Sequence, residues 1–324
     1  MRGNGLEDFA AATVIAAVGA AGYYAFPDNL ALLVRLITTA FLVLSLDLVT
    51  GYCGVATLGH ALLFGTGAYV AGLANVNGIT DPFAMLAAGA FAGSIAGTLS
   101  GAVIVRVSGL AQLVLSIAII QLAQSFASKA ASITGGSDGL SGIDPAPIAG
   151  LFPFDLYSKA AYLLSLVVLI LTFLVLKRMV RSPFGLLCRA IKEDPLRVAA
   201  LGGSPYPALV KMYAVSGLVA GLGGALSAMT AGVVALDSLS FERSANSLVM
   251  LALGGTGTLS GALLGTTVFE IFEHLVSAAN PFHWMVLVAL LLIGVVLFLP
   301  KGLQSLFSRA VFSRAVWVLG KATG

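Results

Sequence analysis

The chain has 324 residues, of which 59% are hydrophobic and 10% are charged, and its formal net charge is +3. Because soluble domains carry about 25% charged residues, this composition excludes an ordinary soluble protein and indicates an integral membrane protein. So small a net charge argues against a nucleic-acid partner. The two cysteines, Cys53 and Cys188, fit neither a disulfide framework nor a metal site, so no bound metal is expected.

A helix needs about 20 mostly apolar residues to cross a bilayer, and ten runs of this kind occur in the chain. The sequence therefore predicts an all-α integral membrane protein with about ten transmembrane helices, forming a single domain over residues 1–324. The predicted spans are residues 9–26, 29–49, 52–74, 83–105, 110–128, 159–176, 212–235, 244–261, 262–279 and 283–299.

Two of these spans contain signals for a broken helix. Residues 51–74 are rich in glycine, and residues 244–261 contain GGTGTLSG, which could be a half-helix and a turn. The segments TLGHALL (57–63) and TLSGALL (258–264) also look alike. Corresponding glycine-interrupted segments point to a transport pathway, although so short a match could equally arise by chance.

The external loop, residues 128–158, contains TGGSDGLSGIDPAPIAGLFPFD. Its density of Gly, Pro and Asp predicts a turn-rich segment. It could be a plain connection or the place where an external partner docks.

Residues 177–211, between the sixth and seventh spans, form the longest polar and basic segment, with seven of the 17 Lys and Arg residues. The positive-inside rule places this segment in the cytoplasm. Short helices are predicted within it, interrupted at Pro195 and stopped by Gly202 and Gly203. A segment of this length indicates a surface for a cytosolic partner.

This orientation and the ten spans predict that both termini are cytoplasmic. The basic tail, residues 301–324, agrees with that side and is predicted to lie on the inner leaflet as an amphipathic helix. Acidic residues, rather than a basic region, precede the first span, which argues against a cleavable signal peptide.

Ionisable side chains within spans are costly unless they are paired or hydrated. His60 lies about nine residues into its span and is either part of a substrate path or a hydrogen-bonded packing residue. Glu270, Glu273 and His274 share one helical face and could line an aqueous vestibule or form an ion relay. Asp47 is expected to cap a helix or to pair with a cytoplasmic base.

Gln112, Ser116 and Gln121 form a polar stripe on the fifth span, which could join helices or bind a polar solute. The sequence has no Walker A motif, no metal-ligand cluster and no nucleophile arrangement. Neither ATP hydrolysis nor other enzymatic activity is therefore expected of this chain.

Five segments, in order along nearly the whole chain, resemble motifs of the branched-chain amino acid type ABC transporter permeases. The resemblance is to the second, M-type permease of the leucine/isoleucine/valine importer. The segments are GYCGVATLGHALLFGTGAYV (51–70), TGGSDGLSGI (134–143), SPFGLLCRAIKEDPLRVAALG (182–202), SFERSANSLVMLALGGTGTLSGALLG (240–265) and LPKGL (299–303).

The resemblance implies a vitamin-B12-importer-like permease fold in the bacterial inner membrane. Such a subunit is expected to pair with a homologous second permease, two cytoplasmic ATPase subunits and a periplasmic substrate-binding protein. ATP and magnesium would bind to the partner ATPases, and this chain would bind no cofactor.

The resemblance, together with the positions described above, assigns roles to three sets of residues. The expected ATPase-coupling residues are Arg189, Glu193, Asp194, Arg197, Ala199, Ala200 and Gly202. The expected substrate-pathway residues are Asp47, Thr57, Gly59, His60, Gln112 and Ser116. The residues expected to dock the binding protein are Thr134, Gly135, Gly136, Asp138, Gly139, Phe241 and Glu242.

The chain also departs from the family pattern. Asp47 stands where the family commonly has Asn, Cys53 where it has Ala, and Thr57 where it has Ser. Val55 replaces Gln, and Pro195 is unusual in the coupling loop, as is Cys188. Most of these departures lie near the expected pathway, so they leave the substrate more open than the fold.

The sequence predicts an importer permease for branched-chain or other hydrophobic amino acids or related small carboxylates. An importer for urea, short amides or aromatic carboxylates remains an alternative. An alternative from another class is an ion-coupled secondary transporter with Glu270, Glu273, His274 and Asp47 as its relay. A channel or scaffold without an energised step is a further possibility.

Overall fold

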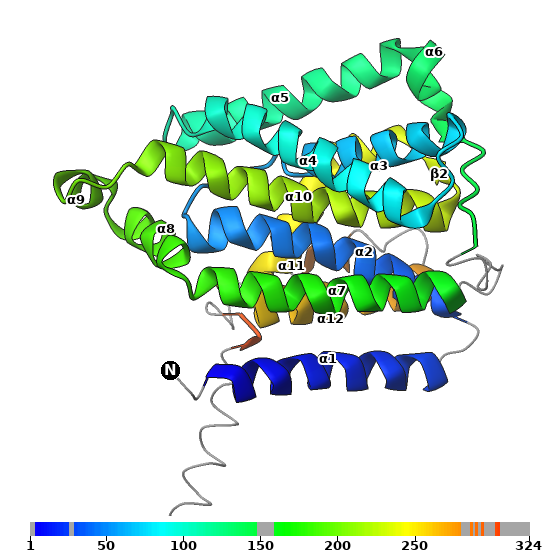
Figure 1. The fold of residues 1–324 in the computed structure, drawn as a ribbon, viewed down its shortest axis with the longest axis horizontal. Coiled ribbons are helices and arrows are strands. Elements are labelled where there is room, and N and C mark those ends of the chain that lie inside the picture. The colour runs from blue at the N-terminus through cyan, green and yellow to red at the C-terminus, as the bar shows by residue number, and fades with distance from the viewer. Residues whose placement is uncertain are drawn as a thin grey trace, which may run out of the picture.

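The structure, a computed structural model, describes residues 4–25, 29–147 and 159–279, and a few positions between 286 and 304. Its long helices lie side by side as a bundle (Figure 1). In the described part of the chain, six helices are long and apolar enough to cross a membrane. The all-helical membrane character is thereby confirmed, whereas the count of ten spans is not. The predicted span 283–299 and the tail 301–324 lie largely outside the described residues.

The helices are α1 (Asn4–Ala25), α2 (Leu30–Leu46), α3 (Ala61–Val76), α4 (Pro82–Ile104), α5 (Leu110–Lys129), α6 (Ala131–Thr134), α7 (Lys159–Val180), α8 (Pro183–Glu193), α9 (Pro195–Ala200), α10 (Pro205–Ala231), α11 (Phe241–Gly254) and α12 (Leu259–Ala279). The shorter elements are the π-helical turn η2 (Asp47–Tyr52), the 3-10 turns η3 (Gly136–Asp138) and η4 (Leu236–Leu239), and the strands β1 (Leu140–Ser141) and β2 (Val233–Val234).

The bundle has two different ends (Figure 1). At one end, β1 pairs antiparallel with β2, next to α6. At the other end, α8 and α9 stand outside the bundle between α7 and α10. The basic segment is shorter than the sequence suggested, because Lys177 lies in the last turn of α7 and Lys211 lies in α10. The interruption at Pro195 and the stop after α9 are confirmed.

The two spans with broken-helix signals are not full crossings. α3 has 16 residues and α11 has 14, so they are about 24 and 21 Å long at 1.5 Å per residue, short of a bilayer core of about 30 Å. The prediction of continuous spans at 52–74 and 244–261 is wrong, and the alternative of broken helices is confirmed. Both TLGHALL and TLSGALL straddle the start of a helix, α3 and α12 respectively.

α4 and α10 form the tightest helix pair, because glycines let their backbones touch. A Cβ atom added to Gly93 would collide with the carbonyl oxygen of Gly217, and one added to Gly217 would collide with the carbonyl oxygen of Gly93. Gly97 meets the backbone of Tyr213 in the same way. A side chain at these positions could not be accommodated by a rotamer change of a neighbour, because the atoms it would meet belong to the main chain of the other helix.

We expect Gly93→Leu to lower the thermal stability of the detergent-solubilised protein strongly. Overpacking a close contact costs about 1–3 kcal/mol, and here the backbones of α4 and α10 would have to separate. Fluorescence-detected size exclusion after heating measures the loss. The matched control is Ala87→Leu, since Ala87 is exposed on the same helix. Equal melting temperatures of the two variants would show that the backbone contact between α4 and α10 does not limit stability.

The outer side of α4 and α5 is apolar and exposed. Phe91, Leu122 and Phe126 are 69%, 73% and 70% exposed. Large exposed apolar side chains along spanning helices are suited to lipid. This side of the bundle is therefore suited to contact with lipid, although α5 also exposes polar residues such as Gln121 and Ser125.

Candidate functional site

The first candidate site is a stretch of non-helical backbone, residues 53–60, between η2 and α3. Gly54 opens it with a φ of 74°, and Thr57 and His60 are each 1% exposed. Irregular backbone at membrane depth is stable only where protein or water satisfies its polar groups. The hydrogen-bond partners of this backbone therefore show whether protein or water satisfies it.

Serines from two distant helices satisfy the broken backbone. Ser116 in α5 accepts a hydrogen bond from the Leu58 N–H at 3.0 Å. Ser244 in α11 accepts one from the Ala61 N–H, the first residue of α3, at 2.9 Å. These hydroxyls replace the bonds that a continuous helix would have made.

His60 is held by two further serines. Its Nε2 lies 3.0 Å from the Ser45 hydroxyl and 2.9 Å from the Ser216 hydroxyl. The Ser45 hydroxyl donates to the Leu42 carbonyl, and the Ser216 hydroxyl donates to the Ser45 carbonyl. Both hydroxyl oxygens therefore lie within hydrogen-bond distance of the same ring nitrogen, and the other ring nitrogen, Nδ1, has no partner among the described residues. This geometry matches the packing role predicted as one alternative for His60.

Four of the six expected pathway residues meet at this broken helix: Thr57, Gly59, His60 and Ser116. A Cβ atom on Gly59 would collide with the Ser116 carbonyl, so a glycine is needed for α5 to approach. Gln112 lies one turn away on α5 and is 8% exposed, whereas Gln121 is exposed. The structure thus groups these residues in a filled interior.

Asp47, the sixth expected pathway residue, lies near the α8–α9 end and joins two chain segments. Its side chain is 0% exposed, and its Oδ1 accepts a hydrogen bond from the Gly257 N–H at 2.6 Å. Its Oδ2 has no hydrogen-bond partner within the described chain. A Cβ atom on Gly51 would collide with this carboxylate and with the Gly257 nitrogen. The sequence analysis expected Asp47 to cap a helix or to pair with a basic side chain. In the structure its partner is a backbone N–H of the turn before α12.

α8 is fastened to the end of η2 beside Asp47. The Lys192 ammonium donates a hydrogen bond to the Gly51 carbonyl at 2.6 Å. The Arg189 guanidinium lies over the Tyr52 ring, 4.9 Å from its centroid, in a cation–π contact. Gly51 and Asp47 therefore link three parts of the chain: α8, the end of α2 with η2, and the turn before α12.

α8 has a buried face and an exposed face. Gly185, Cys188 and Ile191 are buried, and the Cys188 thiol lies close to that of Cys53, which is also buried. Leu186 on the other face is 56% exposed. The cysteines thus belong to the packing of α8 against the bundle.

α9 is a short capped turn that stands in the open. Asp194 accepts hydrogen bonds from the N–H groups of Leu196 and Arg197, both at 3.0 Å, and pairs with the Arg197 guanidinium at 3.4 Å. Leu196 and Leu201 are 81% and 87% exposed. The other expected coupling residues are also exposed: Glu193, Ala199, Ala200 and Gly202. Apart from the fastening residue Arg189 and the cap pair of Asp194 with Arg197, these residues are free for contact with another protein.

The segment TGGSDGLSGI is tightly folded at the β1–β2 end. Thr134 is buried and donates to the Ala130 carbonyl at 2.9 Å. Gly135 and Gly139 have φ angles of 76° and 75°, which side chains disfavour, and Cβ atoms at either position would meet backbone. Gly136 is also buried. These residues shape the turn, and its exposed polar side chains are Ser137 and Asp138, whose hydroxyl and carboxylate are joined by a hydrogen bond of 3.3 Å.

Phe241 and Glu242, the other residues expected to dock a binding protein, open α11 at the same end and are exposed. Ser240 caps this helix by accepting from the Arg243 N–H at 3.1 Å. Asp138 and Glu242 therefore belong to one end of the bundle, as the predicted docking role requires.

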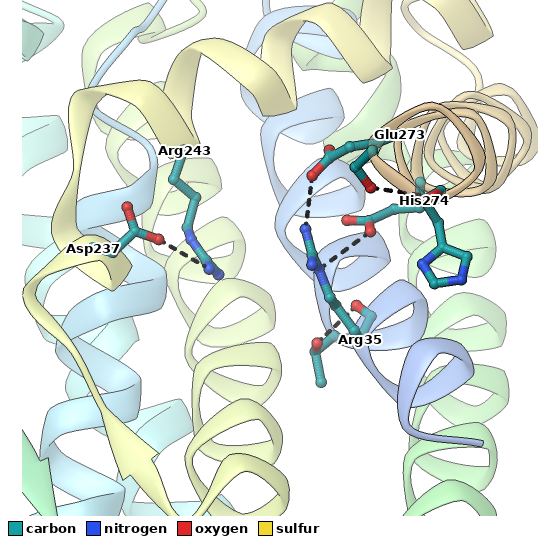
Figure 2. A network of polar contacts seen from close by, with 8 residues as sticks. Arg35, Asp237, Arg243, Glu273 and His274 are labelled. Atoms are coloured by element: carbon teal, nitrogen blue, oxygen red, sulfur yellow. Dashed lines mark hydrogen bonds and ion pairs between the residues drawn. The ribbon is translucent and has the colours of Figure 1, made fainter. Parts of the chain in front are cut away.

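A second candidate site is a polar pocket of about 160 Å³ near the β1–β2 end. It lies between α2, α11, α12 and η4, and two arginines and four carboxylates line it. Figure 2 shows Arg35 beside Glu273 and Arg243 beside Asp237. The charged lining residues are Arg35, Arg243, Asp237, Glu242, Glu270 and Glu273.

Arg35 is the centre of one ion-pair group in this pocket (Figure 2). Its guanidinium lies 3.3 Å from the Glu270 carboxylate and 3.0 Å from the Glu273 carboxylate. His274 is exposed, and its ring points away from Arg35 (Figure 2). Of the three residues predicted to share a face, only the two glutamates therefore reach the pocket.

Three of the serine partners, Ser45, Ser216 and Ser244, were missed from the sequence. Gly257, Lys192 and the role of Arg35 were missed as well. Hydroxyl residues within apolar spans, such as Ser45 and Ser216, were the available signal. The sequence does not indicate which helices are adjacent, however, and therefore which partners they meet.

We expect Ser244→Ala to destabilise the protein by about 1–3 kcal/mol, because it leaves the buried Ala61 N–H without an acceptor. Ser165→Ala is the matched control: Ser165 is equally buried, and its hydroxyl has no hydrogen-bond partner in the described residues. Thermal melting in detergent compares the two. A loss of similar size in both variants would show that the Ser244 hydroxyl does not support the broken helix.

Comparison with known proteins identifies the chain's family. Residues 29–299 match the family model described as "Branched-chain amino acid transport system / permease component". The chain belongs to this permease family. It is therefore a multi-pass membrane protein of a transport system, and the resemblance found in the sequence is confirmed.

Two curated relatives are similar over most of the chain. Both are named "High-affinity branched-chain amino acid transport system permease protein LivM", one from Salmonella typhimurium and one from Escherichia coli. Each is 25% identical over 281 residues, which cover 80% of this chain and 66% of the relative. The chain thus spans somewhat less than two thirds of the length of these relatives. No solved structure gave a significant match.

Proposed function

We propose that the chain is a permease subunit of an ATP-driven bacterial importer for branched-chain or other hydrophobic amino acids. The observation that carries this proposal is the α8–α9 element, which stands outside the bundle with Leu196 and Leu201 exposed. Exposed apolar side chains on a short polar element are typical of a protein interface. Membership of the permease family and the names of the two relatives support the substrate class.

In this proposal α8 and α9 dock on a cytoplasmic ATPase subunit. Nucleotide-driven movement of the ATPase is passed through Lys192 and Arg189 to the end of α2, and through Asp47 to the turn before α12. Each ligand can shift the permease only by binding its two states differently. The Asp47–Gly257 contact is the joint at which the movement reaches α12.

The remaining partners follow from the same proposal. A homologous second permease completes the pathway, two ATPase subunits bind ATP and magnesium, and a periplasmic binding protein delivers the solute to the β1–β2 end near Asp138 and Glu242. The chain itself binds no cofactor and catalyses no reaction. It lies in the inner membrane with both termini in the cytoplasm, and its fold is of the vitamin-B12-importer-like type.

An ion relay is less well supported than the importer. Arg35 in α2 and Asp47 at the start of η2 are twelve residues apart, or about 18 Å at 1.5 Å per residue. Glu270 and Glu273 pair with Arg35 at one end, while Asp47 binds a backbone N–H near the other. The acidic residues of the supposed relay therefore form two separate groups.

The test is co-purification of the tagged chain from its native membrane, followed by identification of the bound proteins. We expect two ATPase subunits and a second permease with the parent chain, and loss of the ATPases with Glu193→Arg. Glu193 is exposed, so this change leaves the contacts of α8 to the bundle intact. Retention of the ATPases and normal uptake by Glu193→Arg would exclude this face as the docking site. Deletion of residues 189–197 is a poorer test, because it also removes Lys192.

A further inference from the structure

The polar pocket between α2, α11, α12 and η4 is built from charges of both signs. Arg35 contacts Glu270 and Glu273, and Arg243 contacts Asp237 at 3.4 Å. With Glu242, the lining holds two cations and four anions. When all are ionised, the pocket is negative overall but still presents two guanidinium groups.

This pocket does not face lipid. Arg35 lies within the first two turns of α2, and its side chain is 61% exposed. Charged residues within spans face a water-filled cavity or another protein, because their exposure to lipid is costly. The apolar side of the bundle, formed by α4 and α5, carries the exposed aromatic and aliphatic side chains instead.

The ion pairs leave room for exchange with a solute. Charge-assisted N–H···O bonds are about 2.7–2.9 Å long. Arg35 to Glu273, at 3.0 Å, is close to this range, whereas Arg35 to Glu270 measures 3.3 Å and Arg243 to Asp237 measures 3.4 Å. Of the two carboxylates that share Arg35, Glu270 therefore makes the longer contact. Asn246 and Ser247 add uncharged polar groups to the lining.

The size and charge of the pocket select a class of solute. A cavity of about 150 Å³ can hold a benzene-sized molecule, and this pocket has about 160 Å³. A zwitterion can place its carboxylate on a guanidinium and its ammonium on Glu270 or Glu273. A solute with only a carboxylate meets an excess of negative charge, and a neutral amide gains no ion pair.

We propose that this pocket binds the charged head of a zwitterionic α-amino acid during its passage, with the carboxylate on Arg35 or Arg243 and the ammonium on Glu270 and Glu273. The inference rests on the proposed transport function and narrows its substrate class. It favours amino acids over urea, short amides and aromatic carboxylates.

The test uses Asn246→Cys in the assembled importer, in membranes, with a membrane-impermeant maleimide. The native thiols at Cys53 and Cys188 are buried, so the introduced thiol is the expected target. Leucine is expected to slow labelling by about tenfold at ten times its half-protecting concentration, because only the empty pocket reacts. N-acetylleucine, which has only a carboxylate, and leucinamide, which has only an ammonium, are expected to protect much less.

Ser137→Cys is the matched control, because Ser137 is exposed at the same end but outside the pocket lining. Its labelling is expected to be unchanged by leucine. Adding Glu270→Gln and Glu273→Gln to Asn246→Cys is expected to abolish protection by leucine. If that variant fails to assemble, Arg35→Lys is the milder substitute, expected to keep protection but require more leucine.

Three outcomes would overturn the inference: labelling that leucine does not slow, equal protection by N-acetylleucine, or a thiol that is unreactive because another subunit covers the pocket. Uptake of radiolabelled leucine by the same membranes separates the two proposals. If ATP-dependent leucine uptake is present without protection, only the pocket assignment fails. If the membranes take up a neutral amide in the presence of ATP but take up no amino acid, the assignment of amino acids as substrates in the proposed function is wrong.

Discussion

Lys192→Met is expected to uncouple ATP hydrolysis from transport while the ATPase subunits remain bound. The Lys192 ammonium holds α8 to the Gly51 carbonyl at 2.6 Å, and the exposed docking side chains of α9 are untouched by the change. A hydrogen bond to a charged group contributes about 1.5–3 kcal/mol, which corresponds to about a 10- to 100-fold shift in an equilibrium. We therefore expect leucine uptake to fall at least tenfold at a similar rate of ATP hydrolysis.

The measurement is uptake and ATP hydrolysis by the same proteoliposomes, with subunit composition checked on gels. Lys211→Met is the matched control, because Lys211 lies on α10 beyond α9 and is exposed; its uptake is expected to be unchanged. Normal uptake by Lys192→Met would show that α8 does not act through Gly51. Loss of the ATPase subunits would instead make Lys192 part of the docking surface.

Asp47→Ala and Asp47→Asn are expected to differ sharply. Asp47→Ala removes the carboxylate that accepts from the partly buried Gly257 N–H, a charged hydrogen bond worth about 1.5–3 kcal/mol, and separates the turn before α12 from the end of η2. Asp47→Asn keeps a carbonyl oxygen for the 2.6 Å bond and removes a buried negative charge, whose burial is unfavourable. We expect loss of both thermal stability and uptake for Asp47→Ala and near-parental values for Asp47→Asn.

This pair also separates the importer from an ion-coupled transporter. Asparagine cannot carry a proton, so a relay through Asp47 would fail in Asp47→Asn as completely as in Asp47→Ala. The resemblance already favours the structural role, since the family commonly has Asn at this position. Abolished uptake in Asp47→Asn, with the protein still folded and assembled, would return the relay to consideration.

Much of the fold is accessible from local sequence signals. Uninterrupted apolar runs predicted α4, α5 and α7 to within a few residues. Pro195 and Gly202 predicted the division and the end of the α8–α9 element, because proline lacks an N–H and glycine adopts positive φ. The glycines after Gly51 and the GGTGTLSG sequence indicated that two spans could be broken.

The contacts within the sites depend on which helices are adjacent, and hydropathy does not show this. Arg35 meets Glu273 across 238 residues of chain, and Gly257 meets Asp47 across 210. Ser45 and Ser216 can be recognised as hydroxyl residues within apolar spans, but no local pattern shows which residue they contact, so their bond to His60 could not be predicted. His274 was placed with the glutamates by helical spacing alone, which does not distinguish the pocket side of α12 from its exposed side.

The broken helix has a consequence for the synthesis of the protein in the cell. The acceptor of the Leu58 N–H is Ser116, 58 residues later in the chain. The acceptor of the Ala61 N–H is Ser244, 183 residues later. The Ala61 N–H is therefore synthesised long before Ser244, its acceptor in the finished protein. The bond that closes the start of α3 can thus form only after the ribosome has made the beginning of α11.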